Sequence, residues 1–363
     1  MIADLPGVPM DEGVRGHTAC DLLSTEALVR YAREKAPALG VPAEWLSDDH
    51  SVPVRVGLPR LVADRLESPC AEERAAAAAI GRRLGRNLGH ILLVLHRGDA
   101  VNRLARAEWH DGDWDRWAAV RCVWLGGGLV TGLLGELVAR EARHYLGETG
   151  QAGQITIEVS ERPDAMGLLG ASRFLPADTR QALSLDCGST LVKRACVTLI
   201  GGCLVDVQSY QPLPVPWDLT GPDHFPGPGD MPARRALGRR VLAFVSEVIA
   251  QTLAESESDG HAQGSEVMLS VATYVRGGRL LGSGPYAQMG CLARDVRPLL
   301  AEATSQLTGR SLSIHPIHDG TAAAALHAGT PNAVVLVLGT ALAVGFPPPL
   351  ASHLRPLALI KRP

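Results

Sequence analysis

The chain has 363 residues, enough for two domains or lobes that each bury a core. Hydrophobic residues make up 46% and charged residues 20% of it, proportions that are ordinary for a globular protein. The formal net charge of −3 gives no reason to expect nucleic acid or an anionic membrane surface as a partner. The first residues lack a basic segment followed by an apolar one, so no secretory signal is predicted and we expect a cytoplasmic protein.

Two further features bear on the environment of the chain. The seven cysteines form no CxxC pair and stand largely within apolar runs, so we expect buried free thiols. Residues 333–351 carry no charge and approach the length of a membrane span. They also contain Gly339, Gly345 and three consecutive prolines, which favour strand, turn and loop over a membrane helix.

The first half predicts a mixture of helices and strands. Apolar residues at helical spacing predict helices that begin after Ser24, near Ala71, after Gly128 and near Asp164. The third of these helices is expected to bury one face, comprising Leu129, Leu133, Leu134, Leu137 and Val138. Continuous apolar runs predict strands over 120–125 and 155–159, and the polar stretch 97–115 predicts a loop.

The second half begins after a junction over 176–181 and has a different texture. It predicts three strands joined by tight turns, at 183–186, 192–199 and 204–210. An irregular loop rich in Pro and Gly is expected over 211–232. Further strands are predicted at 267–271, 312–317 and 334–338, and helices at 237–253, 292–307 and 321–327. The order of three strands, helix, strand and helix is a ribonuclease-H-like pattern and indicates an α/β fold.

The stretch LSLDCGSTLVK, residues 183–193, combines a carboxylate, a glycine and hydroxyls at a turn between two strands. Asp186 is suited to hold a metal-bound water, and Gly188 lets the backbone approach a phosphate closely. The simpler alternative is a β-turn in which Asp186 is only a turn former.

A second acid, Asp319, ends a predicted strand and opens a predicted helix. In that position it could accept a proton from a substrate hydroxyl as the oxygen attacks phosphorus. The alternative is an N-cap with no chemical role.

Two glycine-containing turns are weaker candidates. Gly339-Thr340 follows a strand and could offer backbone N–H groups and a hydroxyl to phosphates, although a buried hairpin would have the same sequence. Gly126, Gly127 and Gly128 stand between a strand and a helix, where a base or ribose could lie on the backbone. No G-x-G-x-x-G fingerprint of a dinucleotide site is present.

Taken together, these stretches resemble the ROK family of sugar kinases and repressors, within the actin-like ATPase superfamily. LSLDCGSTLVKRACVTLIGGCLV is similar to the family's first phosphate motif, EVMLSVATYVRGGRLLGSGPY to its substrate-loop region, and HDGTAAAALHAG to its catalytic helix. VVLVLGTALAVG resembles the second phosphate motif, CVWLGGGLVTGLLGELVAREARHYL the adenosine motif, and DAMGLLGASRFL the last helix.

The resemblance implies an ATP-dependent kinase of a hydroxyl on a small sugar, amino sugar or cyclitol, with ATP and magnesium as cofactors. It implies that Asp319 is the general base and that Asp186 holds the magnesium ion through water. The implied nucleotide-binding residues are Asp186, Gly188, Ser189, Thr190, Lys193, Gly339, Thr340, Gly126, Gly127 and Gly128. The implied substrate-binding residues are Thr273, Gly277, Gly278, His318, Glu12 and His17.

The motifs occur in an order that resembles a circular permutation of the family. The adenosine motif and the last helix come first, and the second phosphate motif comes near the end. The resemblance therefore implies a two-lobed actin-like ATPase fold with a large lobe of residues 1–178 and 319–363 and a small lobe of 179–318. Residues near Met1 and Pro363 are then expected to lie close together, because permutation requires neighbouring ends.

The chain departs from the family pattern at three motif positions. Ser189 replaces a glycine, His318 replaces the asparagine before the catalytic acid, and Ala341 replaces the last glycine of the second phosphate motif. The alternative function is therefore a catalytically silent regulatory protein that binds nucleotide or sugar on the same scaffold. No helix-turn-helix segment is predicted, so nucleic acid is not expected as a partner. The substrate, the pathway and the choice between monomer and homodimer stay open.

Overall fold

The computed structural model describes residues 1–46, 52–151, 153–221, 224–227, 229–261, 264–282, 284–351 and 353–358, with only the backbone at 52 and 53. The chain divides into two compact units. Unit 1 comprises Met1–Asp164 and Thr330–Phe346, and unit 2 comprises Ala165–Gly329 and Pro347–Pro363. The boundaries expected from the sequence, after residues 178 and 318, both fall inside unit 2. The expectation about Met1 and Pro363 lies outside the described residues.

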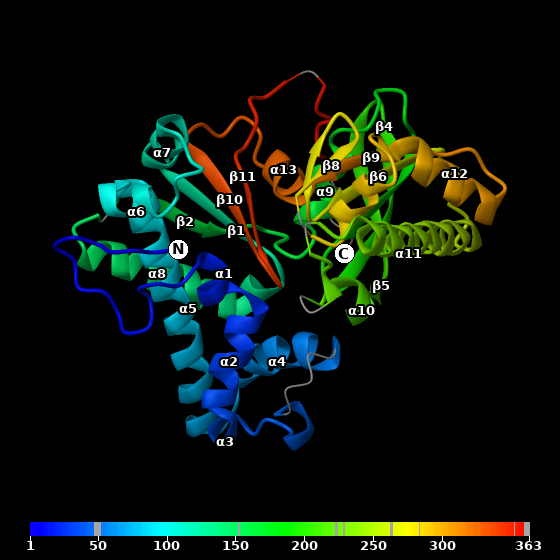
Figure 1. Ribbon diagram of the computed structural model, residues 1–363. Coiled ribbons are helices and arrows are strands. Elements are labelled where there is room, and N and C mark those ends of the chain that lie inside the picture. Colours follow the sequence, from blue (N-terminus) through cyan, green and yellow to red (C-terminus); the bar gives the residue numbers. More distant parts are fainter. Residues whose placement is uncertain are drawn as a thin grey trace. The chain divides into compact units, whose positions relative to one another are not determined.

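Unit 1 is a small sheet with many helices (Figure 1). Its helices are α1 (Ala19–Leu23), α2 (Thr25–Glu34), α3 (Ala36–Leu39), η1 (Ala43–Trp45), α4 (Val52–Arg65), α5 (Ala71–Arg97), α6 (Ala100–Leu104), α7 (Asp111–Ala118), η2 (Gly128–Val130) and α8 (Gly132–Glu148). Its strands are β1 (Cys122–Gly126), β2 (Thr156–Val159), β10 (Ala333–Leu338) and β11 (Leu342–Gly345). They lie in the order β11-β10-β1-β2, with β1 parallel to both β10 and β2 and β11 antiparallel to β10.

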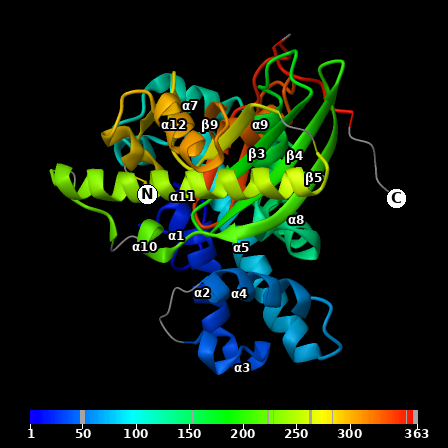
Figure 2. The same cartoon turned by 90° about the vertical axis from the view of Figure 1, so that its right-hand side faces the viewer.

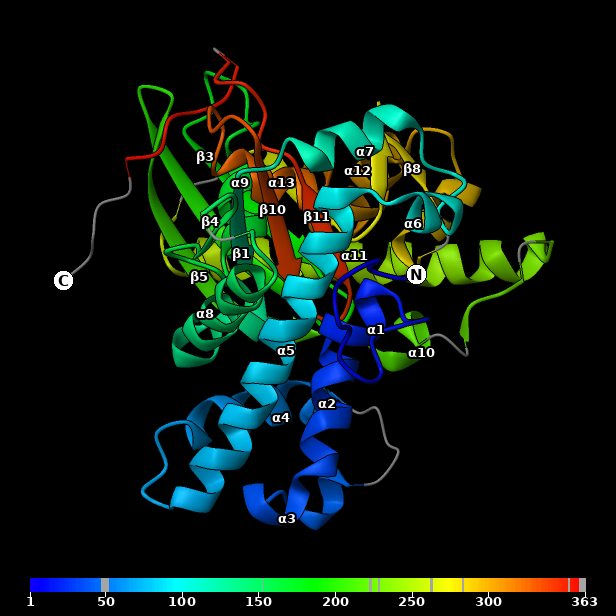
Figure 3. The same cartoon turned by 90° about the vertical axis from the view of Figure 1, so that its left-hand side faces the viewer.

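Helices α5 and α8 lie side by side in this unit (Figure 3). Gly81, Gly85 and Gly89 recur every four residues along α5 and face α8. A Cβ at Gly85 would come within 2.6 Å of the Glu141 Cβ, and one at Gly89 within 2.6 Å of the Tyr145 ring. The glycine row therefore lets the two helices approach more closely than larger residues would allow.

Unit 2 is built on a five-stranded sheet in the order β5-β4-β3-β6-β9. Its strands are β3 (Gln181–Cys187), β4 (Leu191–Ile200), β5 (Cys203–Pro214), β6 (Glu266–Val271) and β9 (Ser313–His318), with a separate hairpin of β7 (Tyr274–Arg276) and β8 (Arg279–Leu281). Strands β3, β4 and β5 are antiparallel, and β6 and β9 continue the sheet in parallel with β3. Its helices are α9 (Met166–Ser172), α10 (Trp217–Thr220), α11 (Met231–Ser258), η4 (Tyr286–Cys291), α12 (Val296–Thr308) and α13 (Asp319–Ala325).

Both faces of this sheet are covered. The long helix α11 crosses one face, together with α12, over a core that includes Leu183, Leu185 and Ile314 (Figure 2). Helices α9 and α13 pack against each other and cover the other face, over Ala182 and Met268. Because the central strands are buried on both sides, they are continuous apolar runs in the sequence, as expected for parallel strands.

The mixed α/β class predicted from the sequence is confirmed, with parallel and antiparallel strand pairs. Ser24 is the N-cap of α2, its side chain accepting a hydrogen bond from the Ala27 N–H. None of the described helices combines the length and the apolar character needed to cross a lipid bilayer.

Three local expectations are wrong. The predicted loop over 97–115 contains α6 and the start of α7, because Trp114 and Trp117, three residues apart, bury one face of a short helix. The expected irregular loop over 211–232 begins as the end of β5, where Pro214 is tolerated on an edge strand, and it also contains α10. Leu133, expected on the inner face of α8, is 44% exposed, because the helix begins at Gly132 after a separate turn of 3-10 helix.

The cysteines also differ from the expectation of burial. All seven are free, but only Cys187 and Cys196 are buried, and Cys20 and Cys70 are exposed. The two buried thiols lie in β3 and β4, whose apolar runs are the core of the sheet, whereas Cys20 and Cys70 lie at the starts of helices.

Candidate functional site

Asp186 lies at the carboxyl end of the central strand β3. Along this strand, Leu183, Leu185 and Cys187 belong to the core under α11, so the alternate residues point to the opposite face. On that face the Ser184 hydroxyl donates to the Leu168 carbonyl of α9. Asp186 therefore projects toward α9 and α13. It lies beyond the carboxyl ends of the strands, where ligands bind in parallel α/β folds.

The carboxylate of Asp186 is held by its neighbours in the sheet. Ser270, opposite it on β6, donates a hydrogen bond of 2.9 Å to Oδ1. Lys193, opposite it on β4, places Nζ 3.8 Å from Oδ2. A Cβ at Gly167 of α9 would lie 2.4 Å from the carboxylate, so glycine makes room for this side chain. Asp186 retains 17% of its side-chain exposure and is thus fixed in place but accessible.

Asp319 opens α13 directly after β9, the strand next to β6. The Gly320 N–H donates to its Oδ1 at 2.7 Å, and the side chain is 23% exposed. Burial raises the pKa of Asp319 from 3.8 to about 7, and the negative charge of Asp186 adds to the rise. The structure thus brings together the two acids singled out from the sequence, at the same end of one sheet, within electrostatic reach of each other.

His318 precedes Asp319 and is the N-cap of α13, with Nδ1 accepting from the Thr321 N–H at 3.3 Å. Its Nε2 lies 3.2 Å from Oδ1 of Asp319. Tyr274 of β7 stacks on the imidazole, with ring centroids 4.7 Å apart and planes inclined by 19°. Tyr274 is 67% exposed, so its ring forms an accessible aromatic surface over the largely buried His318.

The turn that follows Asp186 is held by a hydrogen bond from Tyr286 of η4. The buried Tyr286 hydroxyl donates to the Gly188 carbonyl at 2.8 Å. Burial raises the pKa of Tyr286 well above its usual value, so the hydroxyl stays a donor. The Gly188 N–H donates a hydrogen bond of 3.1 Å to the Asp186 carbonyl. Ser189 and Thr190 are half-buried. The backbone of the turn is therefore well determined by contacts within unit 2.

Of the expected substrate-loop residues, Thr273 directly precedes the hairpin β7-β8, and Gly277 and Gly278 lie in its turn. The Thr273 hydroxyl donates to the Leu281 carbonyl at 2.5 Å. Gly277 and Gly278 make the turn, both with positive φ. A Cβ at Gly278 would lie 2.2 Å from Oδ1 of Asp295, the N-cap of α12. Thr273 and the two glycines thus shape the hairpin that carries Tyr274.

In unit 1, the two glycine-containing motifs meet at one edge of the sheet. Strands β1 and β10 are parallel, with Gly126 opposite Val337, so their carboxyl ends lie together. Gly127 has φ of +95°, and a Cβ there would lie 2.1 Å from the Leu338 carbonyl oxygen, so only glycine fits. At Gly128, by contrast, a Cβ would meet no atom within 4 Å.

Gly339 and Thr340 follow β10 at this same edge. The Gly339 carbonyl accepts a hydrogen bond of 2.7 Å from the Thr25 N–H, at the start of α2. The Gly339 N–H donates to the Ala341 carbonyl at 3.2 Å. The structure therefore brings the expected adenosine motif and second phosphate motif together within unit 1.

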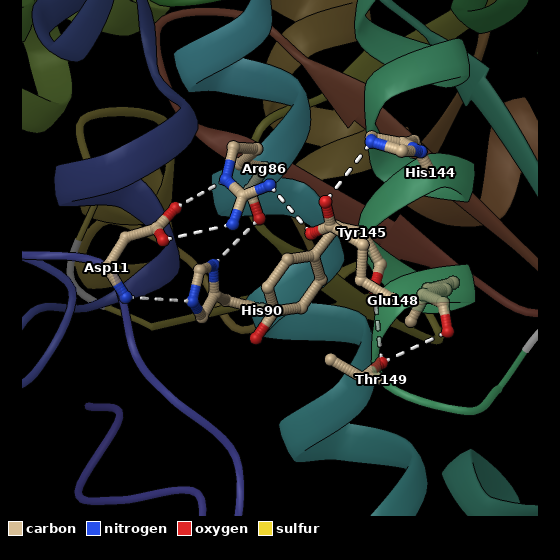
Figure 4. A network of polar contacts seen from close by, with 8 residues as sticks. Asp11, Arg86, His90, His144, Tyr145, Glu148 and Thr149 are labelled. Atoms are coloured by element: carbon tan, nitrogen blue, oxygen red, sulfur yellow. Dashed lines mark hydrogen bonds and ion pairs between the residues drawn. The ribbon is translucent and has the colours of Figure 1, made fainter.

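Glu12 and His17 lie on the exposed N-terminal segment of unit 1. His17 places Nδ1 4.0 Å from Oδ2 of Asp21, and Glu12 follows an anchored residue, Asp11. Figure 4 shows this anchor, in which Arg86 of α5 holds both carboxylate oxygens of Asp11 at 2.7 and 3.1 Å. The hydrogen bonds from Arg86 lower the pKa of Asp11.

The same anchor includes the fully buried His90 (Figure 4). Its Nε2 accepts from the Asp11 N–H at 3.2 Å, and its Nδ1 lies 2.9 Å from the Arg86 carbonyl. The imidazole stacks on Tyr145 of α8, with ring centroids 4.1 Å apart. Arg86 also donates to Glu148 of α8 at 2.9 Å, so the network ties the N-terminal segment to both helices.

Several contributors to the site were not singled out from the sequence. Ser270 and Tyr286 hold Asp186 and its turn, Gly167 makes room for the carboxylate, and Tyr274 covers His318. Ser270 is the one polar residue in the apolar strand 267–271. A buried hydroxyl there needs a hydrogen-bond partner, so the sequence pattern itself points to Ser270. The other three depend on contacts between distant elements, which no local pattern reports.

The side chains around Asp186 determine which mode of magnesium binding the site could support. Among the described residues, no group of three His, Cys, Asp or Glu side chains gathers to hold a metal ion. Magnesium commonly binds through one or two carboxylates plus substrate phosphates and keeps several waters. A single accessible carboxylate at Asp186, with Asp319 nearby, fits that mode and does not fit a closed structural site.

No protein-family model matches this chain, and a comparison with curated proteins finds no match. The resemblance to the ROK family therefore rests on the sequence motifs alone and stays a prediction.

Proposed function

We propose that the protein is an ATP-dependent phosphotransferase that acts on a hydroxyl of a small sugar, amino sugar or cyclitol. The observation that carries the proposal is the pair Asp186 and Asp319 at one end of the unit 2 sheet. A general base works best when its pKa lies near the working pH, and the pKa of Asp319 is about 7. Asp186 lies beside Lys193 and a glycine turn, which suits phosphate and magnesium.

The order of strands supports a permuted actin-like ATPase fold. In unit 2, β3 pairs antiparallel with β4 and parallel with β6, and α12 connects β6 to β9. In unit 1, β10 pairs antiparallel with β11 and parallel with β1, and α8 connects β1 to β2. These pairings correspond, although the described unit 2 sheet has five strands and the described unit 1 sheet four, and in unit 1 the antiparallel pair comes last in the chain. One cut and one fusion in a protein with two similar lobes would give this order.

In the proposed reaction, Asp319 accepts the proton of the substrate hydroxyl. The hydroxyl oxygen forms a bond to the γ-phosphorus of ATP while the bond to the β-phosphate oxygen breaks, which yields a phosphorylated alcohol and ADP. Lys193 offers a positive charge to the phosphates, and Asp186 would hold the magnesium ion through water. When bound, magnesium neutralises charge on the phosphates. The resemblance assigns further nucleotide contacts to Gly126 to Gly128 and Gly339-Thr340, which lie at one end of the unit 1 sheet.

The test is ADP release in the presence of Mg²⁺, ATP and a panel of sugars, amino sugars and cyclitols. Asp319→Asn should retain Mg·ATP binding but lower kcat by at least roughly 100-fold, because the base is lost. Asp186→Asn should weaken Mg·ATP binding. Asp178→Asn, which changes an exposed carboxylate in the same unit, is the matched control and should behave as the wild type.

Two results would overturn the proposal in different ways. Turnover that is unchanged in Asp319→Asn would remove Asp319 from the reaction. Binding of Mg·ATP without turnover on any compound would instead favour the catalytically silent binding protein.

A further inference from the structure

The hairpin β7-β8 has one face in the core of unit 2 and one face toward solvent. Val275 and Leu280 are paired across the hairpin and pack into the core under α11. Because side chains alternate along a strand, Tyr274, Arg276 and Arg279 lie on the other face. All three of these residues are exposed, and we call them the hairpin face.

The two arginines of the hairpin face stand directly opposite each other. Gly277 and Gly278, both with positive φ, close the turn between them and fix this register. The Cβ atoms of such a pair are about 5 Å apart, so the two guanidinium groups can reach a common point. Like charges in opposed positions destabilise a β-ladder, so the hairpin carries a local cost here.

No neighbouring acid offsets this cost. Within the part of the chain that the structure describes, neither Arg276 nor Arg279 takes part in an ion pair, a hydrogen bond or a cation–π contact. Asp295 lies against the turn at Gly278, but Arg297 engages both of its oxygens, at 2.9 Å from Nε and 2.6 Å from Nη2. Sequences break a local rule of this kind most often at functional sites.

Tyr274 connects the hairpin face to the candidate site. Its ring stacks on His318, with centroids 4.7 Å apart, and His318 directly precedes Asp319. Strand β7 lies beside β9, the strand that ends at His318. Two residues of strand span about 7 Å, so Arg276 is a near neighbour of the site within unit 2.

We propose that Arg276 and Arg279 bind an anionic group, a phosphate or a carboxylate, on the acceptor substrate of the candidate site. Guanidinium groups donate paired hydrogen bonds to both kinds of anion, and two of them neutralise a phosphate dianion. The assignment rests on the proposed function for the acceptor, and it narrows the substrate class from neutral polyhydroxylated compounds to sugar phosphates and sugar acids. The arginines bind and orient the acceptor, and the proton of its hydroxyl still passes to Asp319.

The test compares the binding of matched neutral and acidic compounds to the full-length protein by calorimetry at low salt. The pairs are glucose with glucose 6-phosphate, glucose with glucuronate, glucosamine with glucosamine 6-phosphate, and inositol with inositol 1-phosphate. The wild type should bind at least one acidic member at least about tenfold more tightly than its neutral partner. This preference should fall as salt is added, because both arginines are exposed.

The variants are Arg276→Gln, Arg279→Gln and the two together. Each single variant should lose most of the preference, and the double variant should bind the neutral and acidic members equally. Both substitutions relieve the repulsion between opposed charges, so the hairpin should be kept. Arg180→Gln is the matched control, because it removes an exposed arginine just before β3, at the other end of that strand from Asp186, and it should keep the wild-type preference.

The same variants separate the acceptor from the nucleotide as the source of the anion. The affinity for Mg·ATP should stay within about twofold of the wild type in the double variant, since the arginines serve the acceptor. A loss of Mg·ATP affinity by tenfold or more, with no preference for any acidic compound, would assign the arginines to the nucleotide and overturn the proposal.

This proposal and the kinase function fail separately. Equal binding of neutral and acidic members by the wild type, or a preference that persists in the double variant, would overturn the anion site even if phosphoryl transfer is observed. A preference that the double variant loses, without phosphoryl transfer to any compound, would overturn the kinase function and leave the anion site standing.

Discussion

Replacing the buried acid Asp319 by asparagine is expected to stabilise the folded protein at pH 8. Folding raises the pKa of Asp319 from 3.8 to about 7, so the folded state binds this proton more tightly than the unfolded state does. For a carboxyl whose pKa is raised on folding, stability falls as the pH rises from about 4 to about 7 and stays low above that. Asparagine is neutral throughout and does not carry this cost.

The magnitude follows from the same two values. A difference of about three pH units at about 1.4 kcal/mol each gives about 4 kcal/mol as an upper bound. Because the side chain remains 23% exposed and water screens its charge, we expect about 1 to 3 kcal/mol at pH 8. Below pH 4 the difference between Asp319→Asn and the wild type should vanish, because both side chains are then neutral.

The assay is native-state hydrogen exchange of the core amides of β3 and β9 between pH 4 and 8, with exchange rates corrected for intrinsic chemistry. Reporting on these strands restricts the measurement to unit 2. Asp178→Asn is the control, and its difference from the wild type should not vary with pH in the same way. If Asp319→Asn is equal to or less stable than the wild type at pH 8, the carboxylate is not an unfavourable buried charge and the reasoning fails.

The further predictions concern two helical glycines, Gly170 and Gly147, and the buried His90. Gly170→Ala places a Cβ 1.7 Å from the Ala322 carbonyl oxygen and should cost about 1 to 3 kcal/mol or more of unfolding free energy, measured with urea, by forcing α9 and α13 apart. Gly147→Ala, where a Cβ meets no atom within 4 Å in a helix, should instead stabilise by about 0.5 to 1 kcal/mol, and a loss there would contradict the packing described. Burial lowers the pKa of His90, so the anchor of the N-terminal segment should weaken as the pH falls below 6.5. The exchange protection of the Asp11 amide should drop in that range, and protection that is constant from pH 7.5 to 5 would be evidence against the His90 contact.

The sequence predicts the parts of the fold that have strong periodicity. The helix from Ala71 and the buried strands at 183–186, 267–271 and 334–338 are long apolar patterns with few alternatives, and the structure confirms each. The helix α7 was missed because its sequence is mostly polar, and only two tryptophans carry the apolar face. Helix formation there depends on a core supplied by distant residues, which a local pattern does not contain.

In the candidate site, too, local sequence patterns predict some features, and others depend on residues far apart in the chain. Asp186 and Asp319 could be singled out because each is a carboxylate at a strand end followed by a turn or helix. That they lie within electrostatic reach follows from the register of β3 with β6 and of β6 with β9, which is set by pairing between strands that are far apart in the chain. The partners Tyr286 and Tyr274 come from the short elements η4 and β7, whose sequences have no distinctive spacing, so their contacts are visible only in the structure.

The most direct test of the central claim is ³¹P NMR of Mg·ATP incubated with the panel of polyhydroxylated compounds and either wild type or Asp319→Asn, with binding of Mg·ATP measured in parallel. The proposed function predicts a new phosphomonoester signal that grows with ADP in the wild type only, while both proteins bind the nucleotide. A phosphomonoester that forms at the same rate with Asp319→Asn, or a wild type that neither binds Mg·ATP nor forms product, would contradict it.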